Sequence, residues 1–177
     1  MRVKIWYAEC TKAGGNLKAY WPYSSPVGML WIAENGSGIT DIFGSSDFVP
    51  PASAKQETPL LKAAAEQLAE YFAGTRRQFS LPLCPQGTPF QLRVWQALRQ
   101  IPYGETRSYQ QIAAVAGNPK ACRAVGMANN RNPIMIVVPC HRVIGKDGSL
   151  TGFGGGLEMK AYLLDLEKRV LAEGRER

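Results

Sequence analysis

Apolar and aromatic residues gather in three short segments near the start of the chain, and this pattern predicts a small antiparallel sheet. The segments are residues 17–23, 28–34 and 39–43. Asparagine, glycine and serine between the second and third segments are typical turn residues, so we expect a β-hairpin there.

A helix is predicted next, between Thr58 and Gly74. Thr58 has the residue type of an N-cap, Pro59 suits the first helical position, and Gly74 is a typical stop. Apolar residues recur at helical spacing on one face, which we expect to lie in the core: Leu61, Ala64, Ala65, Leu68 and Phe72. The first part of the chain is therefore expected to be an α/β domain. Prolines and a glycine in residues 81–87 mark its end, which divides the chain into domains 1–87 and 88–177.

The second part has the pattern of several short helices. One is expected over residues 90–100, and another begins at a capping box formed by Ser108 and Gln111 and stops at Gly117. Asn118-Pro119 predicts the start of a third helix directly afterwards. Two short helices joined at a glycine are typical of a helix-turn-helix, although any α-hairpin shares this pattern.

The third helix of this part is rich in small residues, namely Ala121, Ala124, Gly126 and Ala128. Small side chains let a helix approach another surface closely. That surface is either a neighbouring helix or a nucleic-acid groove, and the pattern leaves both open.

Charge is unevenly distributed along the chain, whose formal net charge is +7. Residues 88–157 hold eight basic side chains against two acidic ones. A basic segment in an otherwise balanced chain suggests a polyanionic partner, with nucleic acid the first candidate. A merely solvated basic surface explains the charge equally well.

The remaining composition predicts an ordinary globular protein without a membrane segment, metal or cofactor. The longest apolar run, residues 134–138, is only strand-sized, and no secretion signal is evident. Four cysteines without close spacing argue for reduced thiols in the cytoplasm, or in the nucleus of a eukaryote. A single histidine and the absence of any C-x-x-C pair argue against a zinc site.

Cys140 is the candidate for chemistry, because it stands directly before His141, the only histidine. A cysteine attacks as its thiolate, so a reactive one needs a neighbour that takes its proton or stabilises its charge. Glu167 lies among apolar residues of a last helix predicted over residues 158–170, where a carboxylate can orient an imidazole. From the pattern alone, an inert buried cysteine and an exposed glutamate fit as well.

The segment from Pro139 to Val143, with the apolar run before it, resembles the active-site signature of the O6-alkylguanine-DNA alkyltransferases, also called methylated-DNA–protein-cysteine methyltransferases. Further segments resemble that family in order and spacing: residues 90–95, 101–105, 108–113, 123–126, 132–133 and 151–156. The resemblance is specific over residues 88–167 and diffuse before them.

The resemblance implies catalytic roles for five residues. Cys140 accepts the alkyl group, and His141 acts as a base through a bound water. Glu167 orients the imidazole, while Asn132 orders the active-site turn. Tyr109 helps the target base leave the stack and can donate a proton towards the guanine ring.

The resemblance also implies a DNA-binding surface and a substrate pocket. Arg123 fills the gap left by the rotated guanine, on a helix that enters the minor groove. Other residues expected against DNA are Tyr109, Ser108, Ala124, Gly126 and Lys120. The pocket is expected to be formed by Phe153, Gly154, Val143 and Met135. Cys122 and Met127 depart from the small residues common in the family.

The fold that the resemblance implies is a ribonuclease-H-like α/β domain followed by a mostly α-helical winged helix-turn-helix domain. The implied function is direct repair of O6-alkylguanine in double-stranded DNA by a monomer that acts once. Two alternatives remain: a module that recognises alkylated bases without transfer, and a cysteine hydrolase built on Cys140 and His141.

Overall fold

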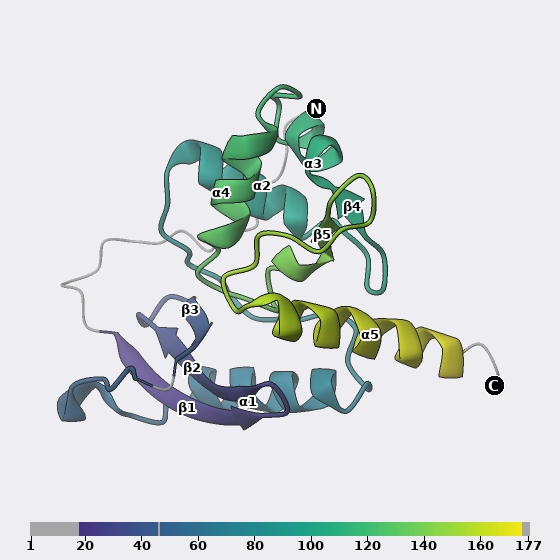
Figure 1. Cartoon of the computed structure of the whole chain (residues 1–177). Helices are drawn as coiled ribbons and strands as arrows, with labels where there is room; N and C mark the ends of the chain where they lie inside the picture. The colour runs from purple at the N-terminus through teal and green to yellow at the C-terminus, as the bar shows by residue number, and fades with distance from the viewer. Residues whose placement is uncertain (1–17, 46, 175–177) are drawn as a thin grey trace.

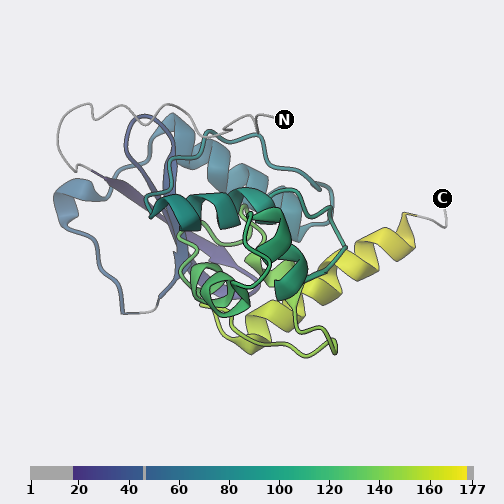
Figure 2. The same cartoon turned by 90° about the horizontal axis from the view of Figure 1, so that it is seen from above.

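The computed structural model describes residues 18–45 and 47–174 as two packed layers. A three-stranded sheet and helix α1 form one layer, and the helices of the second half of the chain form the other (Figure 1). The last helix, α5, runs between the two layers and points outward at its C-terminal end (Figures 1 and 2). Residue 17, at which the first strand was expected to begin, lies outside the described residues.

The predicted antiparallel sheet is confirmed. Its strands are β1 (Ala19–Ser25), β2 (Gly28–Glu34) and β3 (Ile39–Gly44), in the order β1-β2-β3. Ser25 pairs with Gly28 across a two-residue turn, and Gly28 has a φ of 103°, a conformation that favours glycine. The last five residues of β2 are buried, and the strand contacts α1 in the core.

Helix α1 (Pro59–Phe72) follows a short 3-10 helix, η1 (Ala52–Ala54), and begins as predicted. The Thr58 hydroxyl accepts a hydrogen bond of 3.2 Å from the backbone N–H of Leu61. Leu61, Ala64 and Leu68 are buried as expected, whereas Ala65 and Phe72 are only partly buried. Tyr71 takes the fourth buried position of the helix, which apolar spacing did not predict.

The second half of the chain contains the elements α2 (Pro89–Leu98), β4 (Arg107–Ser108), α3 (Tyr109–Val115), α4 (Cys122–Asn130), η2 (Cys140–Arg142), β5 (Val143–Ile144) and α5 (Leu157–Glu173). The capping box of α3 is confirmed, because the Ser108 hydroxyl accepts from the Gln111 N–H and the Gln111 side chain accepts from the Ser108 N–H. Strands β4 and β5 pair in parallel.

The predicted start of α4 at Asn118-Pro119 is wrong. The backbone N–H of Ala121 donates to the Asn118 carbonyl at 3.0 Å, which closes a turn with Pro119 in its second position. The helix itself begins at Cys122 without a side-chain cap. Asparagine followed by proline favours turns as well as helix starts, and here the turn forms.

The outer edge of β3 joins the two halves of the chain. The Ile42 N–H donates to the Pro133 carbonyl at 2.8 Å, and the Met135 N–H donates to the Ile42 carbonyl at 3.1 Å. Cys84 makes a similar bond to Ile39 further along the strand. A single hydrophobic cluster runs through both halves. The segment that leads to Cys140 is therefore held by the amino-terminal sheet.

Among the described residues, Cys122 and Cys140 are free thiols, in line with the expectation of reduced cysteines. Cys10 lies outside the described residues. Within the described residues no helix is long and apolar enough to cross a bilayer.

Candidate active site

A tight reversal of the chain between Asn132 and Cys140 builds the site. The Val138 N–H donates to the Ile134 carbonyl at 2.9 Å, which closes the reversal. At its tip Ile136 has a φ of 73°, a conformation that costs a β-branched residue about 1–3 kcal/mol. Buried neighbours on both sides hold this strained residue in place. The reversal returns the chain to Asn132 and places Cys140 beside it.

Cys140 is nearly fully buried, with 2 % of its surface exposed. Its sulfur accepts a hydrogen bond of 3.0 Å from the side-chain amide of Asn132. Burial raises the pKa of the thiol to about 11, although the Asn132 hydrogen bond and the charge of Lys160 oppose this. The free protein therefore holds Cys140 as a neutral thiol near pH 7.

His141 is buried and bound to Glu167, with 2.8 Å between the imidazole Nε2 and the carboxylate Oε1. Burial lowers the pKa of His141, despite the opposing hydrogen bond and charge of Glu167. An ionised carboxylate can only accept, so Nε2 carries the proton of the neutral ring. Nδ1 then presents a lone pair, and it has no hydrogen-bond partner among the described residues.

Glu167 is a fully buried carboxylate with donors on both oxygens. Oε1, which contacts His141, also accepts hydrogen bonds from the Tyr71 hydroxyl at 2.7 Å and from Arg142. Oε2 accepts from the Gly104 N–H at 2.8 Å and likewise from Arg142. Burial alone would raise the pKa of Glu167, but the hydrogen bonds and charges of His141 and Arg142 outweigh it and lower the pKa to about 2. Glu167 therefore stays ionised, as a residue that orients an imidazole must.

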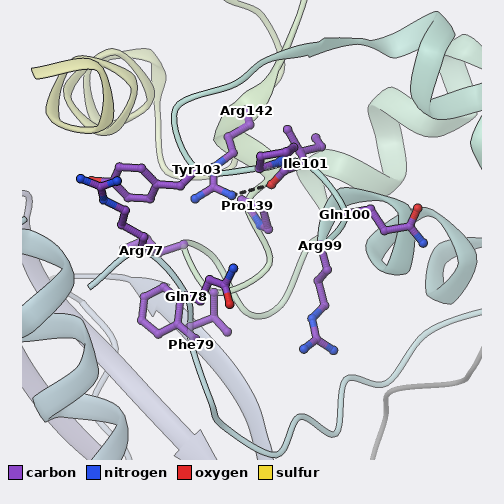
Figure 3. A pocket seen from close by; sticks show the side chains of 12 residues that line it. Arg77, Gln78, Phe79, Arg99, Gln100, Ile101, Tyr103, Pro139 and Arg142 are labelled. Atoms are coloured by element: carbon purple, nitrogen blue, oxygen red, sulfur yellow. Dashed lines mark hydrogen bonds between the residues drawn. The ribbon is translucent and has the colours of Figure 1, made fainter. Parts of the chain in front are cut away.

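An open cavity of about 380 Å³ is lined in part by Arg142. Figure 3 shows Arg142 reaching into it beside Tyr103 and donating to the Ile101 carbonyl, a bond of 2.7 Å. The four residues predicted to form the substrate pocket do not line this cavity, and neither does Cys140. Of the Arg142–Glu167 pair only Arg142 lines the cavity, and the thiol does not open into it.

Lys160 and Tyr109 meet at the carbonyl of Thr151, close to the site. Lys160 is fully buried on α5, and its ammonium donates to the carbonyls of Val143 and Thr151 at 2.5 and 2.6 Å. The Tyr109 hydroxyl donates to the same Thr151 carbonyl at 2.7 Å, and the ammonium lies 5.9 Å from the centre of the Tyr109 ring. Burial raises the pKa of Tyr109, and the nearby Cys140 adds to this. The Cys140 thiol and the Tyr109 phenol are therefore close enough for the charge of one to affect the pKa of the other.

Asn129 is a further buried residue of the site. Its amide nitrogen donates to the Cys140 carbonyl at 3.3 Å and to the Gly152 carbonyl at 3.1 Å. It thereby connects η2 to the glycine-rich loop of residues 151–156. This contact keeps the loop over the active-site turn.

The four residues predicted to form the pocket differ in their burial. Val143, Met135 and Phe153 are buried, while Gly154 is exposed in the glycine-rich loop. A Cβ at Gly154 would come within 2.9 Å of the Asn130 carbonyl. Glycine at this position lets the loop pass close to the end of α4.

The residues predicted to bind DNA lie at the start of α3, on α4 and in the turn between the two helices. Lys120, Arg123 and Ala124 are exposed, and Ser108 and Gly126 are partly buried. A Cβ at Gly126 would lie 3.8 Å from the Tyr109 ring, so α3 and α4 approach closely there. Met127 stands one turn after Arg123 with 58 % of its surface exposed.

The structure brings Asn132 to Cys140 and Glu167 to His141. Three further buried residues with polar groups, Tyr71, Asn129 and Lys160, were not predicted from the sequence. Lys160 had a signal, since it stands three and seven residues before Leu163 and Glu167 on the buried face of α5. Tyr71 had none, because its partner lies 96 residues away. Among the described residues, no group of three or more histidine, cysteine or acidic side chains is placed to hold a metal ion.

Comparisons with known proteins agree with this geometry. Residues 89–169 match the family described as 6-O-methylguanine DNA methyltransferase, DNA binding domain, and residues 19–85 match its ribonuclease-like domain. The constitutive methylated-DNA–protein-cysteine methyltransferase of Bacillus subtilis is 54 % identical over 156 residues, which cover 84 % of this chain and 94 % of that protein. The Methanosarcina barkeri protein of the same name is 49 % identical and covers 83 % of this chain and 95 % of its own.

Solved structures of methyltransferases are also similar to this chain. The O6-methylguanine methyltransferase of Mycobacterium tuberculosis has a TM-score of 0.79 and 47 % identity, and covers 86 % of this chain and 93 % of its own. The structure of the M. tuberculosis protein in complex with DNA also has a TM-score of 0.79, at 47 % identity, and covers 86 % and 94 %. These likenesses confirm an amino-terminal domain with a small antiparallel sheet and a helical carboxy-terminal domain.

Proposed function

The chain belongs to the 6-O-methylguanine DNA methyltransferase family, and from this premise we propose that it repairs DNA directly, by moving an alkyl group from O6 of guanine to the sulfur of Cys140. The observation that carries the proposal is the connected set of Asn132, Cys140, His141 and Glu167. Asn132 holds the buried thiol and Glu167 holds the neutral imidazole of the next residue, whose Nδ1 lone pair is available.

The transfer begins with a proton. The Cys140 thiol gives its proton through a water to Nδ1 of His141, and Glu167 stabilises the imidazolium that forms. A resting pKa of about 11 keeps the thiol unreactive until the substrate is bound. The base is thus needed at the moment of transfer, when the nucleophile must be a thiolate.

The sulfur then attacks the alkyl carbon in line with the bond to O6. A carbon–sulfur bond forms as the carbon–oxygen bond breaks, and the electron pair stays on the guanine, which takes up one proton. Tyr109 is the proposed donor, since its hydroxyl lies at the glycine-rich loop beside the thiol. The product is a thioether, which has no easy leaving step, so one protein repairs one base.

The substrate must leave the duplex before a buried sulfur can reach it. We propose that α4 enters the minor groove and that Arg123 takes the place of the rotated base, for which a long, planar cation is suited. Lys120 lies in the turn before α4, Ala124 and Gly126 lie on α4 itself, and Ser108 caps the neighbouring helix. With β4 and β5 beside them, α3 and α4 fit a winged helix-turn-helix.

We place the substrate pocket between η2 and the glycine-rich loop, where Phe153, Gly154, Val143 and Met135 supply apolar contacts for the base and its alkyl group. The domain boundary is proposed to lie between residues 87 and 88, just before the Thr88 cap of α2. We infer a monomer that acts wherever the DNA of its cell lies, the cytoplasm or a nucleus.

Intact-protein mass spectrometry tests the proposed function. The protein is mixed with a duplex that contains one O6-methylguanine, with an unmodified duplex and Cys140→Ala as controls. One added methyl group on the wild-type protein alone, mapped to Cys140, is the expected result. Tight binding without a mass change would point instead to a module that recognises alkylated bases. Repeated turnover of a small ester or peptide would point to a cysteine hydrolase.

A further inference from the structure

Helix α1 of the amino-terminal domain reaches the centre of the active site through one side chain. The Tyr71 hydroxyl donates a hydrogen bond of 2.7 Å to Oε1 of Glu167, the oxygen that also accepts from His141. Both residues are fully buried. Tyr71 is the one residue before position 88, within the described part of the chain, whose side chain hydrogen-bonds the Glu167 carboxylate.

The position of this hydroxyl is fixed by the packing of its ring. Tyr71 contacts three aromatic rings, with centroid distances of 5.5 Å to Phe72, 5.6 Å to Phe79 and 6.0 Å to Tyr103. These rings leave the phenol little freedom to turn away from the carboxylate. The hydrogen bond is therefore a built-in part of the site.

We propose that Tyr71 is a positioning residue for alkyl transfer, which holds Oε1 of Glu167 towards His141 and limits how strongly the carboxylate attracts the imidazole proton. The inference rests on the function proposed above. It also gives the amino-terminal domain a direct part in the chemistry of the carboxy-terminal one.

Electrostatics support this role. Burial and the charge of Glu167 hold the pKa of Tyr71 well above its usual 10.0, so the phenol remains a neutral donor. A hydrogen bond to a carboxylate withdraws negative charge from it. Without that bond, Glu167 attracts the imidazole proton more strongly, and the pKa of His141 rises. The other titratable groups around this pair are Cys140, Tyr103, Arg142 and Lys160.

Tyr71→Phe removes the hydroxyl and keeps the ring, and Tyr103→Phe is its matched control. Tyr103 is a neighbouring phenol whose buried hydroxyl has no hydrogen-bond partner among the described residues. The measurement is the rate of methyl transfer from an O6-methylguanine duplex, in single turnover with protein in excess, across a range of pH. DNA affinity and thermal unfolding are measured in parallel.

Tyr71→Phe is expected to slow transfer by about 3- to 30-fold, the range for losing part of a hydrogen bond to a charged group, with DNA affinity unchanged. The acidic limb of the rate profile should move to higher pH, because His141 then needs a higher pH to become a free base. Tyr103→Phe should match the wild type in both respects. A lower melting temperature with an unchanged rate and pH profile would overturn the proposal.

Replacement of Tyr71 by 3-fluorotyrosine provides a second test if Tyr71→Phe folds poorly. Fluorine keeps the hydroxyl and nearly the same shape but makes it a stronger donor, so the acidic limb should move to lower pH. A shift in the opposite direction, or none, contradicts the proposal. Absence of transfer by the wild-type protein would instead refute the proposed function itself, so the two failures are distinguishable.

Discussion

The side-chain nitrogen of Asn132 donates to two acceptors at once, the sulfur of Cys140 at 3.0 Å and the carbonyl of Val138 at 2.7 Å. Its side-chain oxygen accepts from the Ile134 N–H at 3.1 Å. One amide therefore ties the thiol to both ends of the strained reversal around Ile136. Asn132 acts on the nucleophile both as a hydrogen-bond donor and as a brace for the turn that carries it.

Asn132→Ala should slow alkyl transfer by about tenfold or more and lower the free energy of unfolding by about 1–3 kcal/mol. The sulfur loses the one side-chain donor that lowers its pKa, and the Val138 carbonyl loses a partner. Single-turnover transfer and denaturant unfolding measure the two effects. Asn130→Ala, on the exposed end of α4, is the control and should change neither. Equal rates for the two variants would contradict this account.

The raised pKa of Cys140 predicts how the thiol responds to pH. Alkylation of Cys140 in the free protein by iodoacetamide should accelerate up to about pH 11, whereas in unfolded protein it should level off near the ordinary pKa of 9.0. The folded state holds this proton more tightly, so its stabilising contribution is complete below pH 9.0 and declines as the pH rises towards 11. Mass mapping of the alkylated peptide reports the rate, and a folded-state midpoint near 9 would be inconsistent with the burial described.

Glu167→Gln should destabilise the protein by about 3–5 kcal/mol, because it leaves the Arg142 guanidinium buried without its counter-charge. The pKa of Glu167 falls from 4.5 to about 2 on folding, so its contribution to stability is present above pH 4.5 and is lost as the pH falls towards 2. Urea unfolding at several pH values measures this. Between these two pH values the free energy of unfolding should fall with pH in the wild type but not in the variant. An unchanged dependence on pH in the variant would mean that other groups cause the acid sensitivity.

The fold could be predicted where its signals are local. Thr58-Pro59, the Ser108 capping box and the turn residues after Glu34 each act within a few residues, and each formed as predicted. Asn118-Pro119 is also local, but its residues satisfy a turn and a helix start equally, and only the structure distinguishes them.

The candidate site was only partly visible in the sequence, because a buried polar residue depends on a partner that lies far away in the chain. Cys140 and His141 are adjacent in the sequence, which indicates them directly as candidates. Lys160 finds its carbonyl partners at Val143 and Thr151, and Tyr71 finds Glu167 across the two domains. Spacing along α5 indicates that Lys160 is buried, but neither composition nor spacing identifies the partners of such residues. Such pairs require the packing of α1, η2 and α5 against one another.

Lys160→Met should impair transfer without unfolding the protein, because methionine fills the apolar part of the space but cannot donate to the carbonyls of Val143 and Thr151. The thiol also loses a nearby positive charge that lowers its pKa, so alkylation of Cys140 should need a higher pH. Lys168→Met, on the exposed face of α5, is the matched control. If the two variants transfer equally well, the buried ammonium has no part in the reaction.

Arg123→Ala should separate base rotation from chemistry. Arg123 is exposed on α4, and its proposed role is to fill the gap left by the rotated guanine. Transfer from duplex DNA should therefore slow by about tenfold or more, since unstacking costs a few kcal/mol that the arginine no longer offsets. Transfer from a free O6-alkylguanine base needs no rotation and should be unchanged. Arg169→Ala, an exposed arginine of α5 paired with Asp165, controls for loss of charge alone. Equal slowing on the duplex and the free base would place Arg123 in the folding or chemistry of the site, and equal slowing in both variants would reduce its role to general attraction for DNA.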